Sequence, residues 1–121
     1  MARTVRKQNT ELVRLLGELR RTARSQHAPI WASVADRLER ARHQVTPVNV
    51  GHLERLTDAE ETVIVPGKLL ADGPLTKRLT VAAFAYSAGA RSKIHAAGGS
   101  ALSLRDLIKS HPDGAGVRLL A

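Results

Sequence analysis

The five histidines are the residues of this sequence best able to bind a metal ion, and their spacing does not build a metal site. No two of them stand four residues apart, and the sequence contains no HExxH pattern. Cysteine is absent, which excludes a disulfide, a thiolate zinc site and a cysteine nucleophile within this sequence. We therefore expect surface histidines, or contacts with phosphate, at the following positions: His27, His43, His52, His95 and His111.

A glycine followed by a lysine, Gly67-Lys68, is similar to the end of a phosphate-binding loop. The full GxxxxGK[ST] pattern is missing, because Thr62 stands five residues before the glycine and Leu69 follows the lysine. Gly67, Lys68 and Gly73 still allow a phosphate to approach the backbone beside a cation. Two interpretations stay open: contact with an RNA backbone, or an ordinary β-turn with a solvated lysine.

No arrangement of acids or serines predicts catalysis. The pair Glu60-Glu61 lies between a predicted helix and a predicted strand, where a solvated turn explains it. Ser87, Ser92 and Ser100 have neither a nucleophile-elbow context nor an evident base partner. A nucleotide-dependent enzyme built on the glycine–lysine pair would lack both a Mg²⁺-binding hydroxyl and a base. We therefore expect that the protein is not an enzyme and uses no cofactor, no metal ion and no small-molecule substrate.

Arginine carries most of the positive charge and is the residue type that points to a ligand. The chain has 19 Lys and Arg against 11 Asp and Glu, a net charge of +8, and 14 of the cations are arginines. The first 43 residues hold ten of the cations and four of the acids, so most of the excess lies there. Guanidinium groups bind phosphates with two parallel hydrogen bonds and stack on bases, which suits structured RNA.

The predicted RNA contacts of the N-terminal third lie on a basic arm and on two adjacent helices. They are Arg3, Arg6 and Lys7 on the arm, and Arg20, Arg21, Arg24, Arg37, Arg40 and Arg42 on the helices. The alternative is a solvated helical face joined by ion pairs such as Asp36–Arg40 and Arg14–Glu18. These few acids can neutralise only part of the set, so the charge points to a polyanionic partner.

With 43% hydrophobic residues, this chain of 121 residues can build the core of one domain. Trp31, Phe84 and Tyr86 are its only aromatic residues, so aliphatic side chains must supply the packing, with Trp31 expected in the core. The scarcity of aromatics disfavours a base-stacking platform and favours contacts with the backbone and shape of RNA. No apolar run could span a bilayer and no secretory signal follows the basic N-terminus, so we expect a soluble intracellular protein.

The N-terminal third is expected to hold the arginines on helices. Residues 1–8 show no apolar periodicity and predict a basic arm. Residues 9–43 predict two amphipathic helices packed on the rest of the chain. Asn9 or Thr10 caps the first helix, and Pro29 starts the second after a break at 26–28.

Residues 44–121 predict a compact body of alternating strands and helices, so the fold class is mixed α/β within a single domain. Its first expected elements are a short helix after Asn49, a strand over 62–65 stopped by Pro66-Gly67, and a shaped loop over 67–78. A strand over 79–85, buried on both faces, is expected to follow, and then a helix capped by Ser87 and ended by Gly98-Gly99. A short helix after Ser103 and a closing strand over 116–120 complete the body. Arg91 and Lys93, on the helix after Ser87, join the candidate RNA contacts.

A series of short motifs runs along residues 9–120. They are ARS (23–25), WASVADRL (31–38), VNVG (48–51), LER (53–55), ETVIVPGKLL (61–70), LTVAA (79–83), SAGA (87–90), KI (93–94), AGG (97–99), SHPDG (110–114) and VR (117–118). In this order they resemble the family of large-subunit ribosomal protein eighteen-e of archaea and eukaryotes, which is related to bacterial large-subunit protein fifteen. Two positions depart from the pattern: Tyr86 stands where Phe is more usual, and His95 stands where an acid often follows Ile94.

The resemblance implies an irregular β-β-α superhelix behind the N-terminal helix pair, and a structural protein of the large ribosomal subunit that binds large-subunit ribosomal RNA. It places Gly67, Lys68, Gly73, Lys77 and Arg78 in the family's glycine-rich basic loop, an expected RNA contact. The helix pair would lie on RNA and on neighbouring large-subunit ribosomal proteins, in the cytoplasmic ribosome and away from any membrane. The alternative function that the charge allows is a basic protein–protein adaptor that binds an acidic partner.

Overall fold

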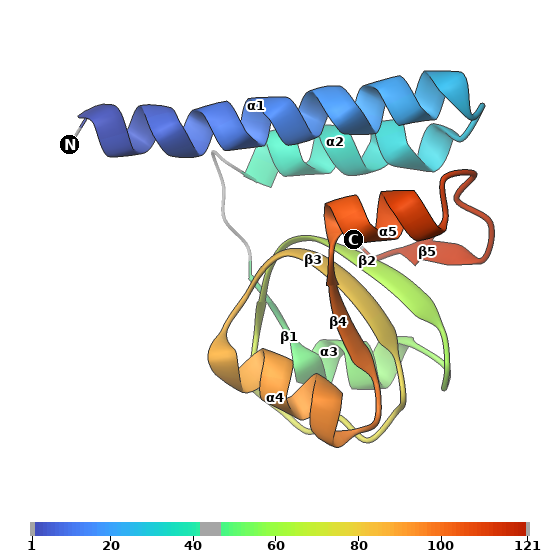
Figure 1. Ribbon diagram of the computed structural model, residues 1–121. Coiled ribbons are helices and arrows are strands. Elements are labelled where there is room, and N and C mark those ends of the chain that lie inside the picture. Colours follow the sequence, from blue (N-terminus) through green and yellow to red (C-terminus); the bar gives the residue numbers. More distant parts are fainter. Residues whose placement is uncertain (1, 42–46, 121) are drawn as a thin grey trace.

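The computed structural model describes residues 2–41 and 47–120, and the side chains of residues 10–40 and 47–120. Two helices, α1 (Ala2–Ser25) and α2 (Pro29–Ala41), lie side by side above a sheet whose strands all run parallel (Figure 1). The other helices are α3 (Val50–Leu56), α4 (Ala88–Ala96) and α5 (Leu104–Ser110). The predicted mixed α/β class with an N-terminal helix pair is confirmed.

The first helix begins at Ala2, so the predicted helix start at Asn9 is wrong and the expected basic arm forms the first turns of α1. Residues 2–16 contain neither glycine nor proline, and most of the first eight are good helix formers. The first eight residues carry no periodic apolar side chains, which is why the pattern of hydrophobic residues did not indicate these helical turns.

The two helices pack through the apolar faces that their periodicity predicts. The buried side chains are Leu12, Leu15, Leu16 and Leu19 on α1, and Trp31, Val34, Ala35 and Leu38 on α2. Trp31 has no exposed surface, which confirms its expected place in the core. The predicted break is also confirmed, because the chain turns at His27, whose φ of 50° lies in the left-handed region.

The sheet has the strand order β1-β2-β3-β4, and β5 pairs with β2. The strands are β1 (Val48–Asn49), β2 (Thr62–Leu70), β3 (Thr80–Tyr86), β4 (Ser100–Ser103) and β5 (Val117–Leu119). The start of β2 pairs with β5 and its end pairs with β1, so these two short strands share one edge of β2 while β3 occupies the other. The closing strand is confirmed, whereas β1 and β4 were not predicted.

Strand β2 continues through Pro66 and Gly67, so the predicted strand end at Val65 and the predicted loop start at Gly67 are wrong. The pairing with β3 changes register between Val65 and Lys68, where β2 has one residue more than its partner. Proline has no N–H to donate to a neighbouring strand, and a bulge is where a sheet accommodates it. The connecting loop therefore begins only after Leu70.

The central strands are buried on both faces, because successive side chains point to opposite sides of the sheet. Ile64 and Ala82 join the core cluster formed with α1, α2 and α5. Val63, Val65 and Val81 join the cluster that contains the apolar residues of α3 and α4. The expected burial of β3 on both faces is confirmed over residues 81–83 and ends at the next residue, which is half exposed.

Serine caps start the two helices that follow β3 and β4, as predicted. The Ser87 hydroxyl accepts a hydrogen bond from the backbone N–H of Ala90, and the Ser103 hydroxyl accepts one from Asp106, both at 3.1 Å. The expected end of α4 is also confirmed, since Gly98 adopts a φ of +85° there. The short helix after Asn49 is α3, although the Asn49 side chain makes no capping hydrogen bond.

Trp31 joins the helix pair to the loop after α5, because its indole N–H donates to the Pro112 carbonyl oxygen at 2.8 Å. We expect Trp31→Phe to lower the free energy of unfolding by about 2 kcal/mol, since the carbonyl loses its partner and the core loses volume. Urea denaturation followed by far-ultraviolet circular dichroism measures this. The control is Phe84→Leu, which changes a half-exposed aromatic and is expected to stay within about 0.5 kcal/mol. Equal losses in the two variants would contradict the assignment.

Candidate nucleic-acid interface

The loop between β2 and β3 is held by Lys93, which the sequence predicts as an RNA contact. Its ammonium group, on α4, donates to the backbone oxygen of Ala71 at 2.6 Å and to that of Gly73 at 2.7 Å. An ammonium group has three N–H donors, so two of them are engaged within the chain. The charge of Lys93 thus fixes the loop against α4.

A second lysine holds the same loop from the side of α3. Lys77 Nζ donates to the backbone oxygens of Glu54, at 2.7 Å, and of Thr57, at the end of that helix. The Glu54 carboxylate accepts hydrogen bonds from the hydroxyl and the backbone N–H of Thr76, at 2.6 and 2.9 Å. These two hydrogen bonds, with the nearby lysine, hold the pKa of Glu54 below its usual value. The expected RNA-binding loop is therefore held to α3 and α4 by hydrogen bonds.

The two glycines predicted at the RNA surface have different surroundings. Gly73 has a φ of +88°, and a Cβ there would lie 2.7 Å from the Cα of Gly51, so this glycine is needed for close packing of the loop on α3. Gly67 lies inside β2, and a Cβ there would meet nothing within 4 Å. The β-turn interpretation of Gly67-Lys68 is wrong, and the exposed Lys68 side chain projects from a strand.

Arg20 joins the two N-terminal helices. Its Nη2 lies 3.1 Å from a carboxylate oxygen of Glu39 and 3.5 Å from one of Asp36. The predicted pair Asp36–Arg40 is not among the ion pairs of the described side chains. The carboxylates of α2 face the neighbouring helix, which the spacing along one helix cannot show.

The predicted pair Arg14–Glu18 is also replaced. Glu18 binds Arg105 of α5, whose Nε lies 2.9 and 3.1 Å from the two carboxylate oxygens, and Arg14 lies 3.8 Å from Glu11. Arg105 was missed as a candidate. It stands four residues before Lys109 on a serine-capped helix, so the i, i+4 spacing of two cations could have indicated a basic face there.

Several exposed cations have no carboxylate partner among the described side chains of residues 10–40 and 47–120. Arg55 and Arg91 belong to this group, but Arg55 Nη2 lies 3.5 Å from His52 Nδ1 and Arg91 lies over the Tyr86 ring. The others are Arg21, Arg24, Arg40, Lys68 and Lys109, together with the half-buried Arg37. These side chains keep their N–H donors available, so they are the strongest candidates for phosphate contact. The side chains of Arg3, Arg6, Lys7 and Arg42 lie outside the described residues.

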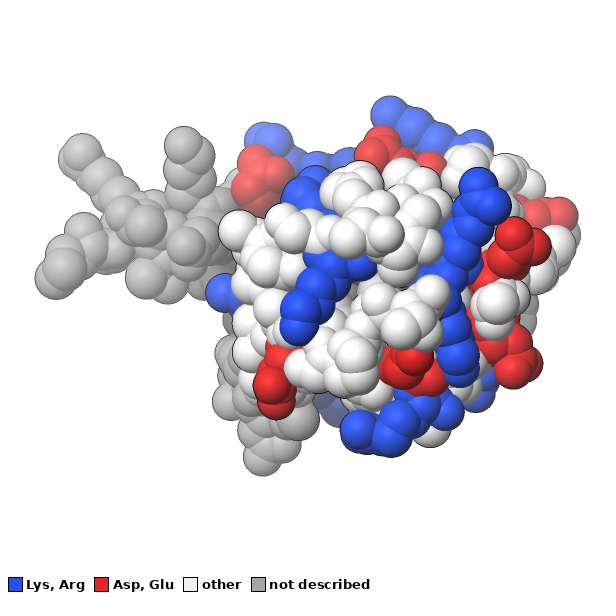
Figure 2. Space-filling model, turned by 90° about the horizontal axis from the view of Figure 1, so that it is seen from below, with Lys and Arg blue, Asp and Glu red and all other residues white. Residues whose placement is uncertain are grey.

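Arg78 and Arg91 are exposed, and each also contacts another group of the chain. Arg78 lies 3.7 Å from a Glu60 carboxylate oxygen, and its Nε donates to the Gly98 carbonyl at 3.3 Å. The Arg91 guanidinium lies 4.9 Å from the centre of the Tyr86 ring. Figure 2, which views the molecule from the side of α3 and α4, shows cationic side chains separated by uncharged surface, with carboxylates beside several of them. The charge on this face is mixed.

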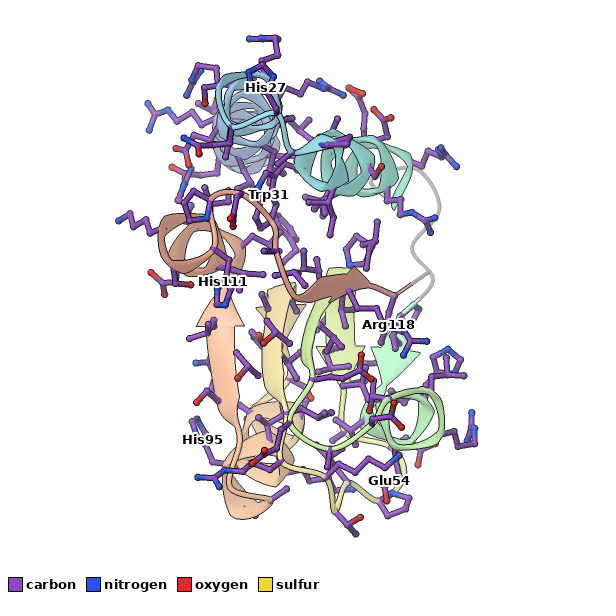
Figure 3. All side chains as sticks on the ribbon, turned by 90° about the vertical axis from the view of Figure 1, so that its right-hand side faces the viewer. His27, Trp31, Glu54, His95, His111 and Arg118 are labelled. Carbon is purple, nitrogen blue, oxygen red and sulfur yellow. The ribbon has the colours of Figure 1, made fainter. Side chains whose placement is uncertain are left out.

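The histidines do not come together. His27, His95 and His111 lie on separate parts of the chain (Figure 3), and the described residues contain no group of three His, Asp or Glu side chains that could hold a metal ion. His43 lies outside the described residues. None of the helices in the described part of the chain is long and apolar enough to cross a membrane.

Comparison with known proteins identifies the family. The model for ribosomal proteins 60S L18 and 50S L18e matches residues 1–121. The chain belongs to this family. Relatives named large ribosomal subunit protein eL18 match nearly the full length: that of Methanopyrus kandleri is 45% identical over 93% of this chain and 92% of its own, and that of Archaeoglobus fulgidus is 41% identical over 96% and 99%. The protein of Halobacterium salinarum is 43% identical over 94% and 97%. The family resemblance of the sequence motifs is confirmed.

In this L18e-family chain, Lys93 and Lys68 differ in whether the chain itself uses their charge. We expect Lys93→Met to lower the free energy of unfolding by about 2 kcal/mol, because two backbone carbonyls lose a charged donor. The matched variant Lys68→Met removes the same charge from an exposed site and is expected to change it by less than about 0.5 kcal/mol. Urea denaturation followed by Trp31 fluorescence measures both. An equal effect of the two variants would refute the structural role of Lys93.

Tyr86 gives a pH-dependent test of the same region. Its hydroxyl oxygen lies 2.6 Å from the Leu102 carbonyl oxygen and 2.8 Å from that of Val81, which share its one proton, and burial raises the pKa of Tyr86 to about 12 from 10.0. The folded state therefore favours the neutral phenol, and this stabilisation, complete below about pH 10, is lost as the pH rises toward 12. The chain has one tyrosine, so phenolate absorbance read immediately after a pH jump reports this group alone. A midpoint near 10 in the folded protein would contradict the burial.

Proposed function

We propose that this protein is a structural constituent of the large ribosomal subunit that binds large-subunit ribosomal RNA. The observation that carries the proposal is the set of partner-free cations on the helix pair, Arg21, Arg24, Arg37 and Arg40. Exposed guanidinium groups without a carboxylate partner are suited to phosphate oxygens. Membership of a ribosomal protein family, with relatives named for the large subunit, supports this assignment.

The proposed contacts are made with the RNA backbone and its shape. Trp31 is sealed in the core and cannot stack on a base, so the chain lacks a wide aromatic platform. To the four helix-pair arginines we add the exposed cations Lys68, Arg78 and Arg91, and Arg3, Arg6, Lys7 and Arg42, whose side chains lie outside the described residues. Arg20, Lys77 and Lys93, with Gly67 and Gly73, are assigned mainly to shaping the surface that carries these side chains.

The proposed role is structural, without a catalytic step or a cofactor. Its partners are large-subunit ribosomal RNA and the neighbouring ribosomal proteins, in the cytoplasmic ribosome. The alternative of an adaptor for an acidic protein uses the same charges, but a protein partner does not present the regular phosphate spacing of a nucleic acid. Salt dependence and partner choice separate the two functions.

The test is filter binding of large-subunit ribosomal RNA fragments over a series of KCl concentrations. We expect the variant that carries Arg21→Gln, Arg24→Gln, Arg37→Gln and Arg40→Gln to reduce the slope of log affinity against log salt by about 3, since each lost phosphate contact removes roughly 0.7–0.9. The matched variant with lysine at the same four positions keeps the charge and is expected to keep most of the slope.

Results of two kinds, in RNA binding and in partner choice, would count against the proposal. One is an RNA affinity that does not depend on salt, or that the four glutamine substitutions leave unchanged while circular dichroism shows a folded protein. The other is preferential binding to acidic proteins over ribosomal RNA fragments under the same conditions, which would favour the adaptor function.

A further inference from the structure

An open groove of about 690 Å³ lies between the C-terminal half of α1 and α5. Arg21 and Arg24 line it from α1, and Arg105 and Lys109 line it from α5, with the partly buried Ile108 between them. Figure 3 looks along these helices and shows α1 above α5, with α2 beside α1. Two helices that are far apart in the sequence thus bring four cations to one concave surface.

The groove keeps an excess of positive charge because its acidic side chain, Glu18, is already paired with a cation of the groove. Glu18 is the one acidic side chain among the described residues that line it, and both of its carboxylate oxygens accept from Arg105 Nε, at 2.9 and 3.1 Å. Arg21, Arg24 and Lys109 have no carboxylate partner among the described side chains. The Glu18 carboxylate also orients the Arg105 guanidinium, whose Nη1 lies 3.9 Å from a carboxylate oxygen of Glu11, so Nη2 is the terminal nitrogen left without a carboxylate among the described side chains.

The two walls of the groove are fixed relative to each other. Leu19 of α1 and Leu107 of α5 are fully buried in the same core cluster, and the ion pair between Glu18 and Arg105 joins the helices above it. A site whose cations are held in place before binding loses less side-chain entropy when it binds. The arrangement therefore suits a ligand that spans both walls with a regular series of negative charges.

We infer that this groove binds a stretch of the ribosomal RNA sugar–phosphate backbone between α1 and α5. Arg21 and Arg24 contact phosphates from one wall and Lys109 from the other, and Glu18 is a positioning residue for Arg105. The inference rests on the proposed function and extends it to α5, whose cations are not among the RNA contacts predicted above. It predicts that α1 and α5 contact the same short segment of RNA.

Single substitutions on α5 test the groove by the same filter-binding assay. We expect Lys109→Gln and Arg105→Gln each to reduce the salt-dependence slope by about 0.8 and the affinity at moderate salt by about fivefold. The matched control is Arg55→Gln, which removes one exposed charge from α3, on the opposite face of the sheet. It is expected to change neither the slope nor the affinity. Because Lys109 has no partner within the described part of the chain, its substitution leaves the α1–α5 packing intact even where Arg105→Gln loosens it.

The outcomes separate this inference from the function on which it rests. If both α5 variants bind like Arg55→Gln while the four-glutamine variant of the helix pair loses affinity, the groove is not an RNA-binding site and the proposed function stands. If Arg55→Gln loses as much affinity as Lys109→Gln, only net charge matters, which also overturns the groove. If the helix-pair variants and the α5 variants all bind RNA like the unsubstituted protein, both proposals fail.

Discussion

Burial of β2 and β3 on both faces is the constraint on which the rest of the structure depends. Val63 and Ile64, adjacent in the chain, enter two different core clusters, and neither cluster can remain open to water. The helix pair and α5 cover one face, and α3 and α4 cover the other. The charged side chains are thereby displaced to the outer surfaces of helices and to the connecting loop, where they can meet a partner.

The parallel pairing of β2 with β3 also constrains the connection between these two strands. Parallel neighbours are usually joined through a helix, which satisfies its own backbone groups. Here the connection after Leu70 is a loop without a helix, and the ammonium groups of Lys77 and Lys93 bind its carbonyl oxygens or those of α3. Charge that a simple count of cations would assign to RNA is thus used to hold the fold, while Arg21, Arg24, Arg37 and Arg40 of the helix pair stay available.

Features set by local sequence could be predicted. The apolar stripes of α1 and α2 and the serine caps of α4 and α5 depend on neighbours within a few residues. The two-residue β1 and the four-residue β4 could not, because they form only against partner strands. The extension of β2 through Pro66 likewise depends on a register change in its pairing with β3.

The candidate site was predictable to the same extent. The exposed arginines of α1 followed from helical periodicity, whereas the ion pairs of Arg20 with α2 and of Arg105 with α1 cross between elements. Which cations are free, and that α5 faces α1 across a groove, are properties of the packed molecule. The sequence located the charge, and tertiary contacts decide which part of it remains for a ligand.

Sedimentation of ribosomes from the source cells through gradients of increasing salt tests the central claim most directly. If ribosomal RNA holds this protein in the large subunit, the chain co-sediments with large subunits, stays bound through a moderate salt wash and is released only at high salt. Recovery of the chain at the top of the gradient at low salt, or with small subunits alone, would contradict the account.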